Sequence, residues 1–223
     1  MIRAVIFDMD GLLIDSEDLW RQAAEQVMQR VGVTLTDDLC RQTVGLSTKL
    51  FLDFCYAQQP WEGDHHHALE NDILALGRQL IVDTVVPMPG ALELVRYLHG
   101  AGYRLAVASA SDRPLIEAVL RKLGLVGYFE TWHSAELEAH GKPHPAVYLS
   151  TARLLGLAPH QCLALEDSHT GLRAAQAAGM LTVAVPAPYE YDDPKFDLAH
   201  FKMKSLADFD PQFLTLSPKL KPD

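Results

Sequence analysis

From about residue 90 to residue 185 the sequence alternates between short apolar runs and longer segments whose apolar residues recur with helical periodicity. Strand-like runs are expected at 104–109, 128–133, 162–165 and 181–185, and helices at 91–100, 112–124, 146–156 and 171–178. Strands that alternate with helices form a parallel sheet, because each parallel pair needs a crossover that covers one face of the sheet. The pattern therefore predicts an α/β fold built on a doubly wound parallel sheet.

The first strand is separated from the others. Residues 3–7 form a continuous apolar run, which is typical of a parallel strand buried on both faces. About seventy residues with helical patterns and no strand-like run follow it. We interpret this block as an insertion, and expect a core over 1–14 and 86–223 and an all-helical cap over 15–85. Such a cap is expected near the carboxyl edge of the sheet, where open α/β folds bind ligands.

Composition and charge limit the kinds of partner that the protein can have. The 223 residues suit one domain that carries an inserted module. Nineteen Lys and Arg against 29 Asp and Glu leave a net charge of −10, which repels a polyanion, so no nucleic-acid partner is expected. No apolar stretch approaches the roughly 20 residues of a spanning helix, so no membrane partner is expected either.

The three cysteines, Cys40, Cys55 and Cys162, are odd in number and far apart in the sequence. This usage is typical of buried thiols in a reducing compartment, and not of a disulfide framework or a zinc site. We therefore expect a cytoplasmic protein, which we take to be a monomer.

Two pairs of acidic residues each follow an apolar strand. Asp8 and Asp10 are two residues apart, and strand alternation lets both carboxylates face one crevice. Two carboxylates this close to each other need a cation or a shared proton, and Mg²⁺ is the cation best suited to carboxylate ligands. The alternative is a pair of solvated acids in a loop. Glu166 and Asp167 repeat the arrangement after 162–165. Helix capping would explain one of these acids but not the repetition. The sequence therefore predicts four carboxylates that converge at one sheet edge.

A serine and a lysine add groups suited to an anion. Ser109 ends another predicted strand, and Ala110 and Ser111 precede a predicted helix, so a hydroxyl and backbone N–H groups could bind a phosphate. A simple helix N-cap is an equally good interpretation of this segment. Lys142 lies between a glycine and a proline, where its ammonium could neutralise phosphoryl oxygens, although most loop lysines are only solvated.

In chain order, the DxDG stretch at 8–11, the strand-end serine, the GKP lysine and the Glu-Asp pair resemble the four motifs of the haloacid dehalogenase-like phosphohydrolases. Residues 7–17, 142–145 and 164–168 are similar to the sugar-phosphatase and β-phosphoglucomutase-like branch of that family. The resemblance covers nearly the whole chain. It implies a Rossmann-like core and a Mg²⁺-dependent phosphatase of small sugar or sugar-alcohol phosphates.

The resemblance also implies a role for each motif residue. Asp8 would be the nucleophile that forms an aspartyl-phosphate, and Asp10 would protonate the leaving alkoxide and later deprotonate the attacking water. Mg²⁺ would be held by Asp8, the backbone carbonyl of Asp10 and Asp167, with Glu166 in or next to its ligand shell.

The remaining motif residues would hold the substrate. The resemblance implies that Ser109, the Ala110 backbone and Lys142 clamp the phosphoryl group, because phosphoryl transfer depends mostly on positioning and charge neutralisation. The expected partner is accordingly a small phosphorylated metabolite.

The chain departs from the mutases of this branch at Trp20, where they place a histidine, and this favours a phosphatase. Trp20 could stack on a sugar, although its place on an apolar helical stripe favours core packing. The loop at 43–49 lacks a cation immediately before its glycine and carries Lys49 later, so the sugar contacts of the mutases do not transfer.

Three alternative functions remain at this stage. A phosphoglucomutase-like isomerase would move phosphate between hydroxyls and need a bisphosphate activator. A phospho-acceptor signalling module could use the same strand-end chemistry, but it needs neither Asp10 nor a cap. A 2-haloacid dehalogenase is disfavoured, because attack on carbon has no use for the second acidic pair.

Overall fold

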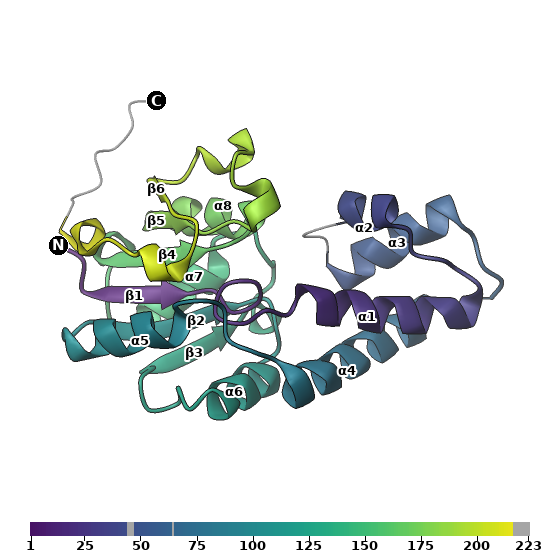
Figure 1. Cartoon of the computed structure of the whole chain (residues 1–223), viewed down its shortest axis with the longest axis horizontal. Helices are drawn as coiled ribbons and strands as arrows, with labels where there is room; N and C mark the ends of the chain where they lie inside the picture. The colour runs from purple at the N-terminus through teal and green to yellow at the C-terminus, as the bar shows by residue number, and fades with distance from the viewer. Residues whose placement is uncertain (44–46, 64, 216–223) are drawn as a thin grey trace. The chain divides into compact units, whose positions relative to one another are not determined.

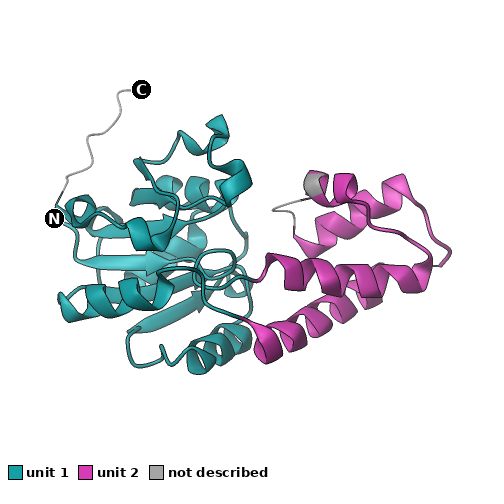
Figure 2. Cartoon of the chain, viewed as in Figure 1, with its two compact units in different colours: residues 1–15, 86–223 teal, residues 16–85 magenta. Residues whose placement is uncertain are grey.

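The computed structural model describes residues 1–43, 47–63 and 65–215, and the chain divides into two compact units (Figure 2). The core unit comprises Met1–Asp15 and Val86–Asp223, and the helical unit comprises Ser16–Val85. Because the helical unit interrupts the core unit, the first strand of the core is far in sequence from its neighbours.

The core unit is built on a six-stranded parallel sheet in the order β3-β2-β1-β4-β5-β6 (Figure 1). The strands are β1 (Ala4–Phe7), β2 (Arg104–Ser109), β3 (Thr131–Ser134), β4 (Cys162–Glu166), β5 (Leu181–Ala184) and β6 (Phe201–Lys202). The predicted α/β fold with a doubly wound parallel sheet is confirmed.

Two details of the sheet differ from the sequence prediction. The run expected at 128–133 becomes a strand only at Thr131, because Tyr128 is held in a turn by a bond from its N–H to the carbonyl of Leu125. The strand β6 was not expected, since two residues are too few to show alternation.

The first strand lies at the centre of the sheet. All four residues of β1 are buried, and Phe7 pairs with Val107 of β2 on one side and with Leu165 of β4 on the other. The residues that follow these three positions therefore meet at one edge of the sheet, and they include Asp8 and Glu166.

Four helices cover the sheet, namely α5 (Ala91–Gly100), α6 (Arg113–Lys122), α7 (Ala146–Leu154) and α8 (His169–Ala177). Strand alternation sends Ala4 and Ile6 to the face covered by α7 and α8, where they join one hydrophobic cluster. Phe7 points to the other face and meets Phe129 edge to face, with ring centroids 5.7 Å apart. In Figure 1, α5 and α6 lie on one side of the strands, and α8 lies on the other.

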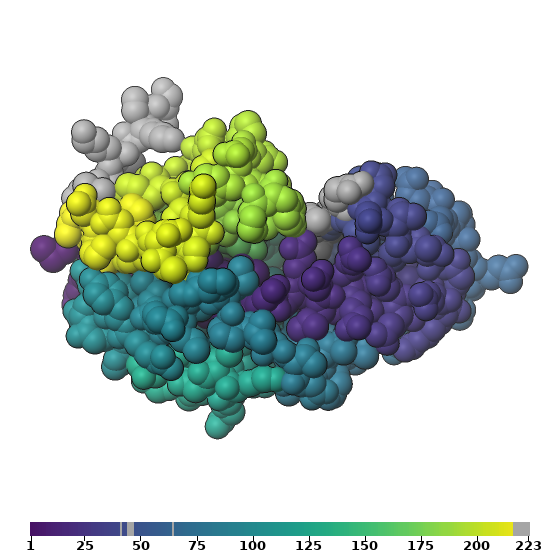
Figure 3. Space-filling model, in the orientation of Figure 1, coloured from purple at the N-terminus to yellow at the C-terminus, as the bar shows by residue number. Residues whose placement is uncertain are grey.

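The described part of the tail after β5, residues 185–215, lies on the surface of the core unit, and its Leu206–Asp208 turn contacts α5 (Figure 3). Ser205 Oγ donates a hydrogen bond to the carbonyl of Pro89 at 3.1 Å, and Leu206 is buried. The tail contains only short 3-10 turns besides β6, at Pro188–Glu190, Pro194–Phe196, Leu206–Asp208 and Pro211–Leu214. These contacts hold the described part of the tail to the core without a long helix or strand.

Three further 3-10 turns lie elsewhere in the described chain, at Gln29–Val31, Ala135–Leu137 and Pro159–Gln161.

The helical unit contains α1 (Glu17–Met28), α2 (Asp37–Thr43), α3 (Thr48–Gln58) and α4 (His66–Thr84). Its described residues contain no strand, and they form their own hydrophobic core. Residues 44–46 of the loop at 43–49 lie outside the described part of the chain. Among the described helices of the whole chain, none combines the length and apolar character that crossing a bilayer requires.

Candidate active site

Three carboxylates meet at the carboxyl edge of the sheet. Asp8 follows β1, Glu166 ends β4, and Asp167 comes directly after it. One oxygen from each of the three lies within 4.8 Å of the others. The convergence follows from topology, because β1 and β4 are neighbouring parallel strands that end at the same level.

A lysine enters this cluster from the loop before α7. The ammonium of Lys142 donates to Asp8 Oδ1 at 2.5 Å, to Glu166 Oε1 at 2.6 Å and to the carbonyl of Ala108 at 3.1 Å. Its side chain is only 8% exposed. One cation therefore lies among three acids in a largely water-free environment.

The pKa values reflect first the burial of these groups and then the excess of negative charge. Burial raises the pKa of Asp8 to about 8, and the opposing effect of Lys142 does not cancel it. Burial, with the charges of Asp8 and Glu166, also raises the pKa of Asp167 well above its ordinary value. For Lys142, burial lowers the pKa, but the carboxylates of Asp8 and Glu166 outweigh it and hold that pKa above its usual range. Added positive charge would therefore stabilise the ionised site.

The cluster fits a hard divalent cation. Its ligand atoms are carboxylate oxygens, which Mg²⁺ prefers, and two of the acids are poorly neutralised by the protein itself. Backbone geometry places the third acid: Gly11 has a φ of +79°, and a Cβ on it would lie 2.2 Å from Asp167 Oδ2. Only glycine adopts this conformation easily and leaves room for the carboxylate.

Asp10 is held by hydroxyl groups from the loop after β2. Ser111 Oγ donates to Asp10 Oδ2 at 2.7 Å, and Ser109 Oγ donates to the same oxygen at 3.4 Å. The loop itself is fixed, because Ser134 Oγ donates to the carbonyl of Ser111 at 2.7 Å. The acid and the predicted phosphate-binding segment thus share one hydrogen-bond network.

Most of the sequence-predicted site residues come together in the core unit, and these are Asp8, Asp10, Ser109, Lys142, Glu166 and Asp167. Ala110 is exposed between Ser109 and Ser111. Trp20 belongs to the helical unit, where its indole lies so close to Gly77 of α4 that a Cβ there would be 2.2 Å from a ring carbon. Lys49 is exposed in the first turn of α3.

Sequence reasoning placed Ser111 in a possible phosphate-binding segment but did not foresee its bond to Asp10, and it missed Tyr148 altogether. Ser111 had a weak signal, since it follows a strand-end serine by two residues. Tyr148 is fully buried, and its hydroxyl donates to Glu166 Oε1 at 2.6 Å. Burial, together with Glu166, raises the pKa of Tyr148 well above its ordinary value, so the phenol keeps its proton. A tyrosine on an apolar helix face is read from sequence as core packing, and its polar partner is not visible there.

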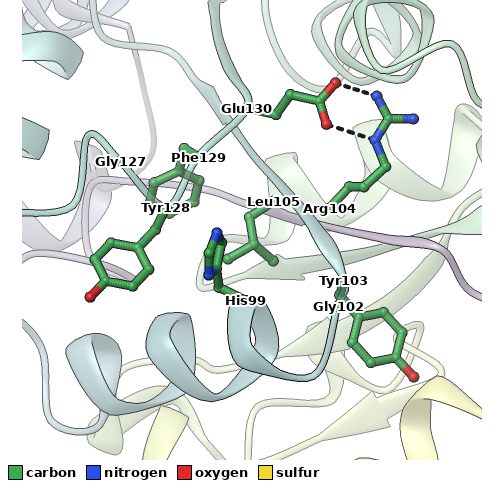
Figure 4. A pocket seen from close by; sticks show the side chains of 9 residues that line it. All are labelled: His99, Gly102, Tyr103, Arg104, Leu105, Gly127, Tyr128, Phe129 and Glu130. Atoms are coloured by element: carbon green, nitrogen blue, oxygen red, sulfur yellow. Dashed lines mark hydrogen bonds and ion pairs between the residues drawn. The ribbon is translucent and has the colours of Figure 1, made fainter.

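A cavity of about 300 Å³ lies at the opposite edge of the sheet (Figure 4). Arg104 begins β2, and Glu130 immediately precedes β3, so this cavity is at the amino ends of the strands. Its charged groups are paired with each other, and Arg104 also donates to the carbonyl of Leu155 at 2.5 Å. The cavity therefore takes no part in the acidic cluster.

Comparisons with known proteins agree on one family. The family model described as haloacid dehalogenase-like hydrolase matches residues 2–179. Hexitol phosphatase B of Escherichia coli K12 is 41% identical over 208 residues, which cover 93% of this chain and 94% of the relative. Fructose-1-phosphate phosphatase YqaB of the same strain is 33% identical, with 81% and 95% covered. The crystal structure of CbbY from Rhodobacter sphaeroides in complex with phosphate superposes with a TM-score of 0.85 at 27% identity, covering 97% of this chain and 100% of that one.

Proposed function

The chain belongs to the haloacid dehalogenase-like hydrolase family and is a phosphoric monoester hydrolase, and from this premise we propose that it hydrolyses small sugar or sugar-alcohol phosphates. The single observation that carries the proposal is the ammonium of Lys142 beside the cluster of Asp8, Glu166 and Asp167. A cation next to a strand-end carboxylate suits an incoming phosphoryl group. The substrate class is supported by the names of two relatives, a hexitol phosphatase and a fructose-1-phosphate phosphatase.

In this proposal Mg²⁺ is the cofactor. Asp8, Asp167 and the backbone carbonyl of Asp10 would hold it, with Glu166 in or next to its ligand shell. When bound, the ion supplies positive charge that offsets the phosphoryl oxygens and the carboxylates of the site. Lys142 supplies positive charge from the protein itself, and its bonds to two carboxylates hold the ammonium in place.

In the first step, a carboxylate oxygen of Asp8 attacks phosphorus, and the bond between phosphorus and the sugar oxygen breaks. Asp10 gives its proton to the departing alkoxide, so the sugar leaves as a neutral alcohol. The hydroxyl of Ser111 holds the carboxyl of Asp10 during this transfer. The product on the enzyme is an aspartyl-phosphate.

In the second step, a water molecule attacks phosphorus and the acyl-phosphate bond to Asp8 breaks. The ionised Asp10 takes a proton from that water, which restores the starting protonation states and releases orthophosphate. Ser109, the Ala110 backbone and Lys142 hold the phosphoryl oxygens through both steps. The helical unit acts as a cap, which excludes bulk water and selects the alcohol part of the substrate.

The test uses the purified full chain and a panel of hexose 6-phosphates, 2-deoxyglucose 6-phosphate and hexitol phosphates. Orthophosphate release is measured with Mg²⁺, with a chelator, and in the Asp8→Asn variant. We expect hydrolysis that depends on Mg²⁺ and falls by at least about 10³-fold in Asp8→Asn, because that variant lacks the nucleophile.

Full activity in chelator, or in Asp8→Asn, would contradict this mechanism. Transfer of phosphate to another hydroxyl without release of orthophosphate would instead identify an isomerase. A persistent aspartyl-phosphate with negligible turnover would identify a phospho-acceptor module.

A further inference from the structure

Tyr148 of α7 contacts both charged partners at the base of the site. Its hydroxyl donates to Glu166 Oε1 at 2.6 Å, and the same oxygen accepts from Lys142 at 2.6 Å. The ammonium of Lys142 also lies 5.2 Å from the centroid of the Tyr148 ring. One tyrosine therefore touches the lysine and the carboxylate that orients it.

The other groups around Glu166 leave this carboxylate little freedom. Its Oε2 accepts from Ser168 Oγ at 3.1 Å and from the Ser168 N–H at 3.4 Å. A Cβ on Gly171 would lie 1.9 Å from Oε1, so the helix backbone presses directly against the carboxylate. Glu166 is completely buried. Its position, and with it the direction in which Lys142 is drawn, depends on these neighbours.

The hydroxyl of Tyr148 is not required for packing alone. A phenylalanine would fill the same buried space, and the nearby buried hydroxyl of Thr151 is satisfied within its own helix, by the carbonyl of Val147 at 2.7 Å. The phenol of Tyr148 instead forms a charge-assisted bond to a carboxylate, and such bonds are shorter and stronger than neutral ones. The bond from the phenol offsets part of the negative charge on Glu166 Oε1. It therefore weakens the attraction between this oxygen and the ammonium of Lys142.

We propose that Tyr148 is a positioning residue for the hydrolysis: its hydroxyl fixes Glu166 and balances the pull on Lys142, so that the ammonium stays between Glu166 and Asp8. This inference rests on the proposed function. Without the hydroxyl, Lys142 is held more tightly by Glu166 and moves away from Asp8, where the phosphoryl group reacts. Misplacement of a catalytic charge by a fraction of an ångström lowers the rate more than it lowers substrate binding.

The experiment compares wild type, Tyr148→Phe and Thr151→Val, each as the full chain. Thr151→Val is the matched control, because it removes a buried hydroxyl from the same helix without touching the site. Three quantities are measured: the melting temperature, kcat and KM for 4-nitrophenyl phosphate at saturating Mg²⁺, and the Kd for orthophosphate by calorimetry.

We expect Tyr148→Phe to lower kcat by about tenfold while KM and the orthophosphate Kd rise by no more than about threefold. Thr151→Val should leave kcat unchanged. It should lower the melting temperature by about as much as Tyr148→Phe does, because each variant removes one buried hydroxyl from α7. A kcat within twofold of wild type in folded Tyr148→Phe overturns the inference, and so does an equal loss in Thr151→Val. A wild-type protein without Mg²⁺-dependent hydrolysis overturns the proposed function instead.

A second measurement does not need Tyr148→Phe to fold. With 3-fluorotyrosine introduced at position 148, the ¹⁹F resonance should shift when orthophosphate and Mg²⁺ bind, because Lys142 and the phenol share one oxygen of Glu166. An unchanged resonance under conditions in which calorimetry shows binding overturns the inference.

Discussion

At the scale of single residues, the acids of this site oppose the stability of the fold that holds them. Asp167 has a pKa well above its ordinary value, first because of its burial and then because of Asp8 and Glu166. Its folded-state carboxyl therefore binds its proton more tightly than the unfolded chain does. Ionisation favours unfolding from a pH near 4 upward, until the pH passes the raised pKa.

Asp167→Asn removes this ionisation, and we expect the metal-free variant to melt at a higher temperature than the metal-free wild type. The advantage should grow as the pH rises above about 4, because the wild type then loses stability while asparagine does not titrate. Thermal unfolding in chelator measures it, and hydrolysis should be lost at the same time. A wild type that is more stable than Asp167→Asn at pH 8 would contradict the electrostatic account.

At the scale of the element, the first residues of α8 both start the helix and contact Glu166 of the site. Ser168 is its N-cap and accepts from the N–H of Gly171, which is an ordinary helix start. Gly171 is a poor helix former, and alanine would be favoured there by about 1 kcal/mol on propensity alone. A Cβ would, however, lie 1.9 Å from Glu166 Oε1, so the helix can approach the carboxylate only without a side chain.

Gly171→Ala should therefore destabilise the protein by about 1–3 kcal/mol, as overpacking does, and should also lower kcat because Glu166 is displaced. Denaturant unfolding and steady-state kinetics measure the two effects. The control is Gly100→Ala at the end of α5, where a Cβ meets nothing within 4 Å. It should leave activity unchanged and be neutral or stabilising by up to about 1 kcal/mol. Equal behaviour of the two variants would show that the contact with Glu166 does not matter.

At the scale of the whole molecule, the site is assembled from segments that are far apart in the chain. Ala4 pairs with both Arg104 and Cys162. In the sequence, the helical unit lies between β1 and the other described strands. The acids converge only once these long-range pairs have formed, so the site belongs to the folded core unit and not to a local segment. A ligand of the site then binds only the folded chain and shifts its unfolding equilibrium.

Mg²⁺ with orthophosphate should consequently stabilise the wild type by about 2.7 kcal/mol at one hundred times the dissociation constant. For a chain of this length the melting temperature should rise by about 5–10 °C. Differential scanning fluorimetry can compare this rise with that of Asp167→Asn, in which it should largely disappear. An equal rise in both proteins would place the bound ions elsewhere.

Much of the fold could be predicted because its signals are local. The apolar run at β1 and the alternation after residue 90 predict a parallel sheet, and strand-end positions predict that Asp8 and Glu166 lie close together. The two acids lie close together because β1 and β4 pair in parallel, with Phe7 opposite Leu165. Strand β6 escaped prediction, because two residues paired by long-range contacts leave no periodic pattern.

The sequence by itself determined most of the elements, the parallel sheet and the acids at its edge, since burial, periodicity and strand ends are encoded by neighbouring residues. Only the tertiary structure decided that Tyr148 donates to Glu166, that Ser111 holds Asp10 and that Trp20 packs on Gly77. Each of these contacts joins residues from separate segments of the chain, and the partner of a group across such a separation depends on how helices and loops pack. That packing is a property of the whole fold, which no local pattern records.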